Sequence, residues 1–143
     1  MPRSVSTRQL SRVLLLTIVF TTCMTAGYAG TPEQVSIQTL LAQAPSYDLH
    51  MVTLQGVTRD LQVLPRIMIV KCGLSNGRAT FTLDDGTASL LVEVLGNCSP
   101  QALNTLPKDG DVVRMTATIH LLNTDLPVRV QAVAGAIQIL DPK

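Results

Sequence analysis

The segment from Phe81 to Val94 constrains the fold of this chain more than any other. It contains two short runs of residues with β propensity, joined by Asp85-Gly86. Both residues of this pair tolerate positive φ, so the dipeptide favours a tight reversal of the chain. We therefore predict an antiparallel β-hairpin over residues 81–94.

Residues 1–29 have the organisation of a secretory signal peptide. The basic start contains Arg3, Arg8 and Arg12 and no acidic residue. Residues 13–20 form an apolar core, and Gly27-Tyr28-Ala29 has the small-residue pattern that signal peptidase requires. The core is shorter than the roughly 18–20 residues that span a bilayer, which argues against a membrane anchor. We expect cleavage after Ala29 and a single periplasmic or secreted domain, residues 30–143, with no transmembrane segment.

Cys23 leaves a second possibility open. A cysteine just after an apolar core can be the lipid-modified residue of a bacterial lipoprotein. The residues before it, Phe20-Thr21-Thr22, lack the small residue usually found beside such a cysteine. Loss of Cys23 with the signal peptide is the favoured interpretation.

The net charge changes when the signal peptide is removed. The whole chain has 11 Lys+Arg and 10 Asp+Glu, a net charge of +1. Three of the arginines and none of the acids lie in residues 1–29, which leaves 8 basic and 10 acidic groups, a net charge of −2. A mildly acidic domain has no general attraction to phosphate backbones or anionic membranes.

Two cysteines remain in the predicted mature chain, Cys72 and Cys98, and they flank the predicted hairpin. An even pair in an exported chain indicates a disulfide, and antiparallel strands can bring such flanking positions together. A redox pair or metal ligands are the alternatives. The chain has no Cys-x-x-Cys spacing, and neither histidine is near a cysteine in sequence, so a structural bridge is favoured.

The region before the hairpin predicts a helix and a long strand. Ser36 is a suitable N-cap for a helix over residues 36–43, which Pro45 would end. Residues 51–63 predict one strand, with a bend or an edge position at Pro65. We expect extended chain over residues 66–72 and a turn-rich segment over residues 73–77.

The region after the hairpin predicts a short helix and more strands. The helix covers residues 99–106, with Ser99 as cap and Pro100 at its first position. Residues 112–120 alternate most clearly, and Val113, Met115, Ala117 and Ile119 share the apolar face. A turn at residues 123–127 leads to runs over residues 128–133 and 136–140.

These elements predict an all-β fold with small α content: a five-stranded Greek-key barrel, a short N-terminal helix, and a short helix between strands 3 and 4. Residues 52–57, 81–87 and 106–113 resemble the corresponding segments of OB-fold domains of the nucleic-acid-binding type. The resemblance covers residues 36–140. It implies a ligand face made by the second and third strands and the loops at either end, but the fold alone does not settle function.

Candidate ligand-binding residues are the cations Arg66, Lys71, Arg78, Arg114 and Arg129. The first three could cluster before the hairpin, and the last two could share the outer face of the final hairpin. Solvated surface charge is the alternative. Five acids lie close by in sequence and would oppose a phosphate backbone: Asp84, Asp85, Glu93, Asp109 and Asp111.

Outside residues 1–29 the only aromatic residues are Tyr47 and Phe81. Single-stranded nucleic acid is usually held by stacked aromatics along a basic groove. Phe81 alternates with Leu83 and fits the barrel core better than a stacking platform, and Tyr47 fits an anchor for the first helix.

No catalytic, metal or cofactor motif is present, and Asp84-Asp85 suits a turn better than an acid pair. His50 and His120 are isolated, so a surface role is favoured over a ligand or proton carrier. We therefore expect no enzyme and no cofactor. Two functions remain open: a non-catalytic binding module for nucleic acid, oligosaccharide or protein, and an assembly subunit that docks through the barrel surface or edge.

Overall fold

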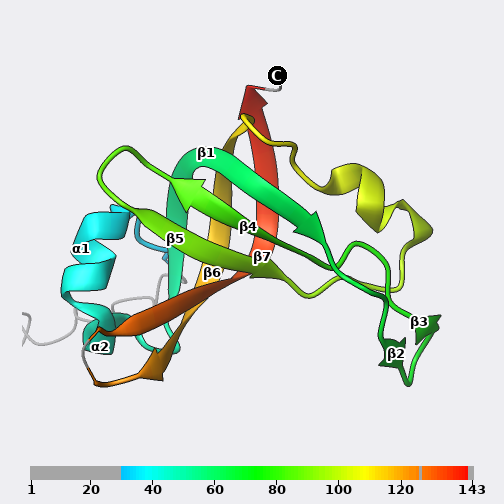
Figure 1. The fold of residues 1–143 in the computed structure, drawn as a ribbon, viewed down its shortest axis with the longest axis horizontal. Coiled ribbons are helices and arrows are strands. Elements are labelled where there is room, and N and C mark those ends of the chain that lie inside the picture. Colours follow the sequence, from blue (N-terminus) through cyan, green and yellow to red (C-terminus); the bar gives the residue numbers. More distant parts are fainter. Residues whose placement is uncertain (1–29, 126, 142–143) are drawn as a thin grey trace, which may run out of the picture. The chain divides into compact units, whose positions relative to one another are not determined.

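The computed structural model describes residues 30–125 and 127–141. The predicted signal peptide and Cys23 lie outside these residues. The described chain has a closed five-stranded barrel (Figure 1). Its strands are β1 (Met51–Val63), β4 (Ala79–Asp84), β5 (Ser89–Val94), β6 (Val112–Asn123) and β7 (Arg129–Asp141).

The strand order around the barrel is β1-β4-β5-β7-β6. All neighbours are antiparallel except β5 and β7, which pair in parallel over residues 91–93 and 131–133. The predicted all-β, five-stranded barrel fold is confirmed. The two C-terminal runs of the prediction are one continuous strand, β7, whose register shifts against β6 near Thr116.

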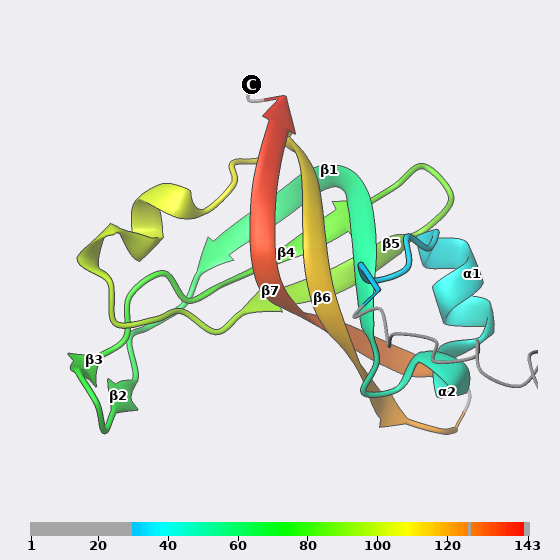
Figure 2. The same cartoon turned by 180° about the vertical axis from the view of Figure 1, so that it is seen from behind.

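Three short helices accompany the barrel: α1 (Ile37–Ala42), α2 (Ala44–Tyr47) and the 3-10 helix η1 (Pro100–Thr105). Both views place α1 and α2 at one end of the barrel and η1 at the other (Figures 1 and 2). Ser36 caps α1 as predicted, because its Oγ accepts the Thr39 N–H at 3.2 Å. α1 ends at Ala42, before Pro45, as predicted. The sequence did not predict α2, in whose first turn Pro45 lies and where its missing N–H costs nothing.

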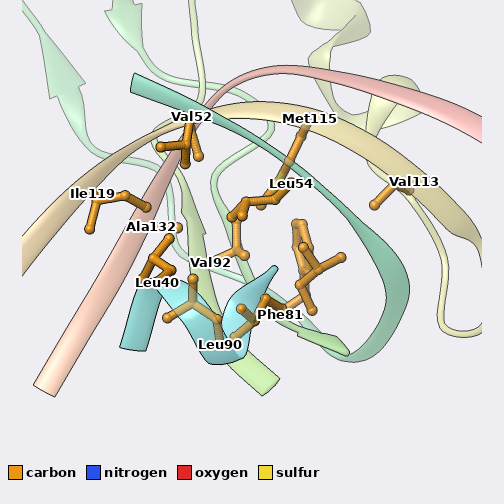
Figure 3. Packing of buried hydrophobic residues seen from close by; sticks show 13 residues of the cluster. Leu40, Val52, Leu54, Phe81, Leu90, Val92, Val113, Met115, Ile119 and Ala132 are labelled. Carbon is orange, nitrogen blue, oxygen red and sulfur yellow. The ribbon is translucent and has the colours of Figure 1, made fainter. Parts of the chain in front are cut away.

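The core lies inside the barrel and is closed by α1 (Figure 3). Phe81 is 1% exposed and packs among aliphatic side chains from every strand of the barrel, so its prediction as a core residue is confirmed. The four residues predicted for the apolar face of β6 are all buried: Val113, Met115, Ala117 and Ile119. The period-two pattern works here because each strand has one face inside the barrel.

Strand β1 bends and pairs with two neighbours. Residues 51–57 pair with β6, and residues 57–63 pair with β4 across a register shift between Arg59 and Gln62. The bend brings Gly56 against β4, where a Cβ atom would lie 2.6 Å from the Asp84 carbonyl oxygen. The absence of a side chain at Gly56 therefore allows β1 to bend and to pair with both β6 and β4.

One expected segment differs in the structure. Residues 66–72 are not one extended run, because β2 (Met68–Ile69) turns at residues 70–72 into β3 (Gly73–Leu74). The two strands pair as a separate antiparallel sheet, with Met68 opposite Leu74. The sequence therefore contains a second hairpin, inserted between β1 and β4.

Candidate binding surface

Residues 64–78 form a projecting hairpin, which we call the stapled hairpin. Both views show it extending away from the barrel, on the side opposite α1 and α2 (Figures 1 and 2). The Cys72 N–H donates to the Ile69 carbonyl at 3.2 Å, so Val70 and Lys71 are the central residues of the turn. Gly73 follows at φ 79, a left-handed conformation that glycine adopts without strain.

Hydrogen bonds fix the base of the stapled hairpin. The Ser75 N–H donates to the Ile67 carbonyl at 2.8 Å, and the Ile67 N–H donates to Ser75 Oγ at 3.0 Å. Ser75 is fully buried, so its hydroxyl is committed to this contact. The Leu64 N–H donates to the Arg78 carbonyl at 2.9 Å where the two chain segments leave the barrel.

A disulfide joins Cys72, at the end of the turn, to Cys98, after β5. The Cα atoms of the two residues are 5.7 Å apart. Beside the disulfide, Asn76 and Asn97 exchange two backbone hydrogen bonds of 2.8 and 2.9 Å. The hairpin is therefore tied to the barrel covalently and by hydrogen bonds, and its turn is held at a fixed place.

The stapled hairpin carries a concentration of exposed aliphatic side chains. They are Ile67, Met68, Val70 and Leu74, and Val63 at the end of β1 is exposed just before them. Val70 is 104% exposed and Met68 is 75% exposed, so the turn presents them to solvent almost completely. Turn positions ordinarily hold glycine, proline or small polar residues. Folding of the hairpin therefore gives no reason for an aliphatic residue at position 70.

The three cations predicted near this loop have different environments. Arg66 and Lys71 are exposed on the stapled hairpin. Arg78 turns toward the barrel, where Nη1 donates to the Pro65 carbonyl at 2.9 Å and Nη2 lies 3.7 Å from Glu93 Oε1. Two cations of the three therefore face outward on the hairpin.

The other two predicted cations do not lie together. Arg114 is opposite Gln138 near one end of the β6–β7 ladder, and Arg129 is opposite Asn123 at the other end. Nine residues of strand separate the two positions along β6, which corresponds to about 30 Å. Arg114 also donates from Nε and Nη2 to Gln55 Oε1, at 3.2 and 3.0 Å.

The acids that could oppose a phosphate backbone are engaged in the fold. Asp109 Oδ1 accepts the Leu61 N–H at 2.8 Å, and Asp111 Oδ2 accepts the Lys108 N–H at 2.8 Å. These contacts fasten the turn before β6, where the buried Thr58 hydroxyl also donates to the Lys108 carbonyl. Their role is structural, because carboxylates satisfy backbone donors in turns.

Asp85 is the acid with the largest number of contacts. Oδ2 accepts the Ile37 N–H at 2.7 Å, and Oδ1 accepts from Thr87 Oγ1, the Thr87 N–H and the Ala88 N–H. Partial burial raises the pKa of Asp85, but the hydrogen bonds from Thr87, Ile37 and Ala88 outweigh it, and the pKa lies below its ordinary value.

The outer face of β4 and β5 is polar except at its centre. Thr80, Thr82 and Glu93 point outward beside Leu91, which is an exposed aliphatic. Glu93 Oε2 accepts from Gln131 Nε2 of β7 at 2.6 Å. No aromatic side chain of the described residues stands on this face, since Phe81 is in the core and Tyr47 packs against it from α2.

Other hollows lie elsewhere on the described part of the domain. Two open hollows of about 370 and 460 Å³ lie on either side of Gln55 and Asp85. A third, of about 170 Å³, lies between the end of β5, η1 and β7. Among the described residues, no group of three or more His, Cys, Asp or Glu is arranged to hold a metal ion. His50 lies in the link from α2 to β1, and His120 lies on β6 opposite Gln131.

None of the helices in the described part of the chain is long and apolar enough to cross a membrane.

Comparison with known proteins identifies the fold. No family model and no curated protein match the sequence. Aspartyl-tRNA synthetase from Entamoeba histolytica superposes with a TM-score of 0.59 at 10% identity, over 81% of this chain and 23% of that chain. The second OB-fold domain of replication protein A from Methanococcus maripaludis superposes with a TM-score of 0.50 at 12% identity, over 67% of this chain and 89% of that chain.

A third similar structure is OBody AM3L09 bound to hen egg-white lysozyme, with a TM-score of 0.50 at 16% identity, over 69% of this chain and 89% of that chain. Identities this low show the fold alone. The described domain is an OB-fold barrel, and it spans 23% of the length of the synthetase.

The stapled hairpin is the part of the surface that sequence reasoning missed. The run Ile67-Met68-Ile69-Val70 was interpretable as one apolar strand leading into Cys72. The available signal was Gly73 directly after the cysteine, since glycine close to an apolar run marks a reversal. Exposure of the run could not be foreseen, because apolar runs are ordinarily buried.

Proposed function

We propose that this chain is an exported, non-catalytic OB-fold binding module. Its binding surface is the stapled hairpin together with the adjoining outer face of β4 and β5. The observation that carries the proposal is the rigid display of Met68 and Val70 at the turn of that hairpin. A contiguous group of exposed apolar side chains, unlike a single one, marks an interaction site.

Export is supported by two independent features. Residues 1–29 have the signal-peptide pattern, and Cys72 and Cys98 form a disulfide, which persists in oxidising compartments. A non-catalytic role is supported by the use of Asp84, Asp85, Glu93, Asp109 and Asp111 as hydrogen-bond acceptors within the fold.

An apolar ligand surface fits the composition better than a nucleic-acid surface. The outer face of β4 and β5 offers Leu91 and threonines where stacking aromatics would be needed. Arg78 is engaged with Glu93 and the Pro65 carbonyl, which leaves Arg66 and Lys71 as outward cations beside the aliphatic turn.

The test compares an apolar probe with an oligonucleotide. The oxidised, exported protein is titrated with the fluorescent dye 8-anilinonaphthalene-1-sulfonate, and saturable enhancement is expected. Met68→Asp should abolish it, whereas Leu122→Asp, at a 57% exposed aliphatic on β6, should leave it unchanged. If the Met68→Asp variant enhances dye fluorescence as much as the wild type does, the proposed surface is contradicted.

The oligonucleotide arm addresses the nucleic-acid alternative. Fluorescence anisotropy of a labelled single-stranded oligothymidylate is measured at about 50 mM and about 200 mM salt, where electrostatic binding differs most. No binding is expected at either concentration. Binding at the lower concentration that weakens at the higher one would overturn the choice of an apolar ligand.

A second candidate function is an assembly subunit that docks by strand addition. β7 pairs with β5 only over residues 131–133, whereas its ladder with β6 runs to Asp141. The edge of β7 beyond Val133 is therefore a place where a strand from another chain could add. Size-exclusion chromatography with light scattering tests docking between copies of the chain: a monomer at every protein concentration would count against it.

A further inference from the structure

We propose that the turn of the stapled hairpin inserts into a membrane surface that carries anionic lipid headgroups. Met68 and Val70 would enter the apolar layer, while Arg66 and Lys71 contact headgroup phosphates. This inference rests on the proposed function, because it names the partner of the hairpin part of that surface.

The first argument is the position of the aliphatic residues. Val70 is a central residue of the turn and Met68 is in the strand that leads to it. Strand β2 and the turn after it lie where the hairpin reverses, beyond the segments that join it to β1 and β4 (Figure 1). An apolar group at the end of a projection can enter an interface to the 5–10 Å depth that shallow insertion requires, without the barrel approaching the lipid.

The second argument is local charge. No acidic residue occurs between Asp60 and Asp84, and this interval contains Arg66, Lys71 and Arg78. Among the described residues, Arg66 and Lys71 form no ion pair. The net charge of the mature chain, −2, therefore hides a cationic hairpin. Cations immediately beside an exposed apolar turn complement an anionic surface.

The third argument is size. Strands β2 and β3 have two residues each, so the tip presents a small, isolated contact area. A stable protein interface buries about 800 Å² on each partner, which a single turn does not supply. Shallow membrane insertion needs only a few apolar side chains and adjacent cations. The stapled hairpin meets that smaller requirement.

The disulfide supports the inference through rigidity. Cys72 is the last residue of the turn and is bonded to Cys98 on the barrel side. A turn that is ordered before it meets the membrane loses little conformational entropy on insertion. Reduction of the disulfide should therefore weaken membrane binding without changing the residues that make the contact.

The experiment is vesicle co-sedimentation of the oxidised, exported protein. Phosphatidylcholine vesicles are compared with vesicles that contain about 30% phosphatidylglycerol, at low and high salt. We expect partition into the anionic vesicles that falls as salt rises. Val70→Asp should lower the partition coefficient at least about tenfold, and Lys71→Gln about fivefold. Asp suits a turn, so Val70→Asp should leave the denaturation midpoint unchanged.

Leu122→Asp is the matched control, since it places the same charge at an exposed aliphatic outside the hairpin. It should bind vesicles as the wild type does. Absence of wild-type binding to anionic vesicles would overturn the inference, as would equal binding by Val70→Asp. If the dye binds in a way that depends on Met68 but the protein does not bind anionic vesicles, the proposed binding surface is supported and the lipid partner is wrong.

Discussion

Asp85 Oδ2 accepts a hydrogen bond from the backbone N–H of Ile37 at 2.7 Å, across 48 residues of sequence. Ile37 is the first residue of α1, and Asp85 begins the loop between β4 and β5. One carboxylate therefore satisfies a free donor at the start of the helix and also the N–H groups of Thr87 and Ala88 in its own loop. The Asp85 side chain therefore links this loop to the start of α1.

Asp85→Asn should destabilise the domain at neutral pH by about 1 kcal/mol, the usual value of a helix-capping contact. The pKa of Asp85 is lowered in the folded state, so its ionised form stabilises the fold above the unfolded pKa of about 3.9. That contribution disappears as pH falls through the folded pKa. Urea denaturation of both proteins from pH 7 to pH 2 should show the stability difference shrinking toward acid; a constant difference would contradict this role.

Cys72→Ser should lower stability by up to ~3–4 kcal/mol, because the bridge closes a loop with a sequence separation of 26. The wild type should lose a similar amount when reductant is added, whereas the variant should not respond. Thermal melts of both proteins with and without reductant measure the effect. Identical melting of the oxidised and reduced wild type would contradict a stabilising bridge.

Phe81→Ala should cost ~3–5 kcal/mol, because the ring is 1% exposed and its removal leaves a cavity in the core. Phe81→Leu, which keeps most of the volume, should cost clearly less. Urea denaturation at constant pH supplies both values. A small loss of stability in Phe81→Ala, accompanied by lost ligand affinity, would instead identify a surface stacking residue.

Gly56→Ala should destabilise the barrel by about 1–3 kcal/mol, because its Cβ would lie 2.6 Å from the Asp84 carbonyl oxygen. Gly30→Ala is the control, because a Cβ atom there meets open space and the backbone has no positive φ. The control should stay within about 0.5 kcal/mol of wild type in the same denaturation assay. Equal losses in both variants would show that close approach at Gly56 is not the cause.

Strand identity could be predicted wherever one face of a strand is buried. The alternation in β6 and in the hairpin of β4 and β5 follows directly from that burial, so both elements agree with expectation. The turn between β4 and β5 was less well specified. Its loop covers residues 85–88, and of the pair Asp85-Gly86 only Gly86 has positive φ. The Asp85 side chain instead accepts the N–H of Ile37, the first residue of α1.

The candidate surface was less predictable than the fold. The cysteines indicated a bridge, but residues 66–72 have the composition of a buried strand. Composition does not distinguish an apolar run inside a core from one held outside it. The placement of Arg78 was likewise hidden, because its partner Glu93 lies on β5, distant from it in sequence.

Local periodicity and simple counting were enough to predict the β-rich class, the barrel-facing residues, the capped helix at Ser36 and the pairing of the two cysteines. The folded chain alone shows that Val70 is exposed to solvent, that Arg78 turns inward and that Asp85 joins a loop to a helix. These outcomes depend on which distant segments meet when the barrel closes, and no local pattern records that.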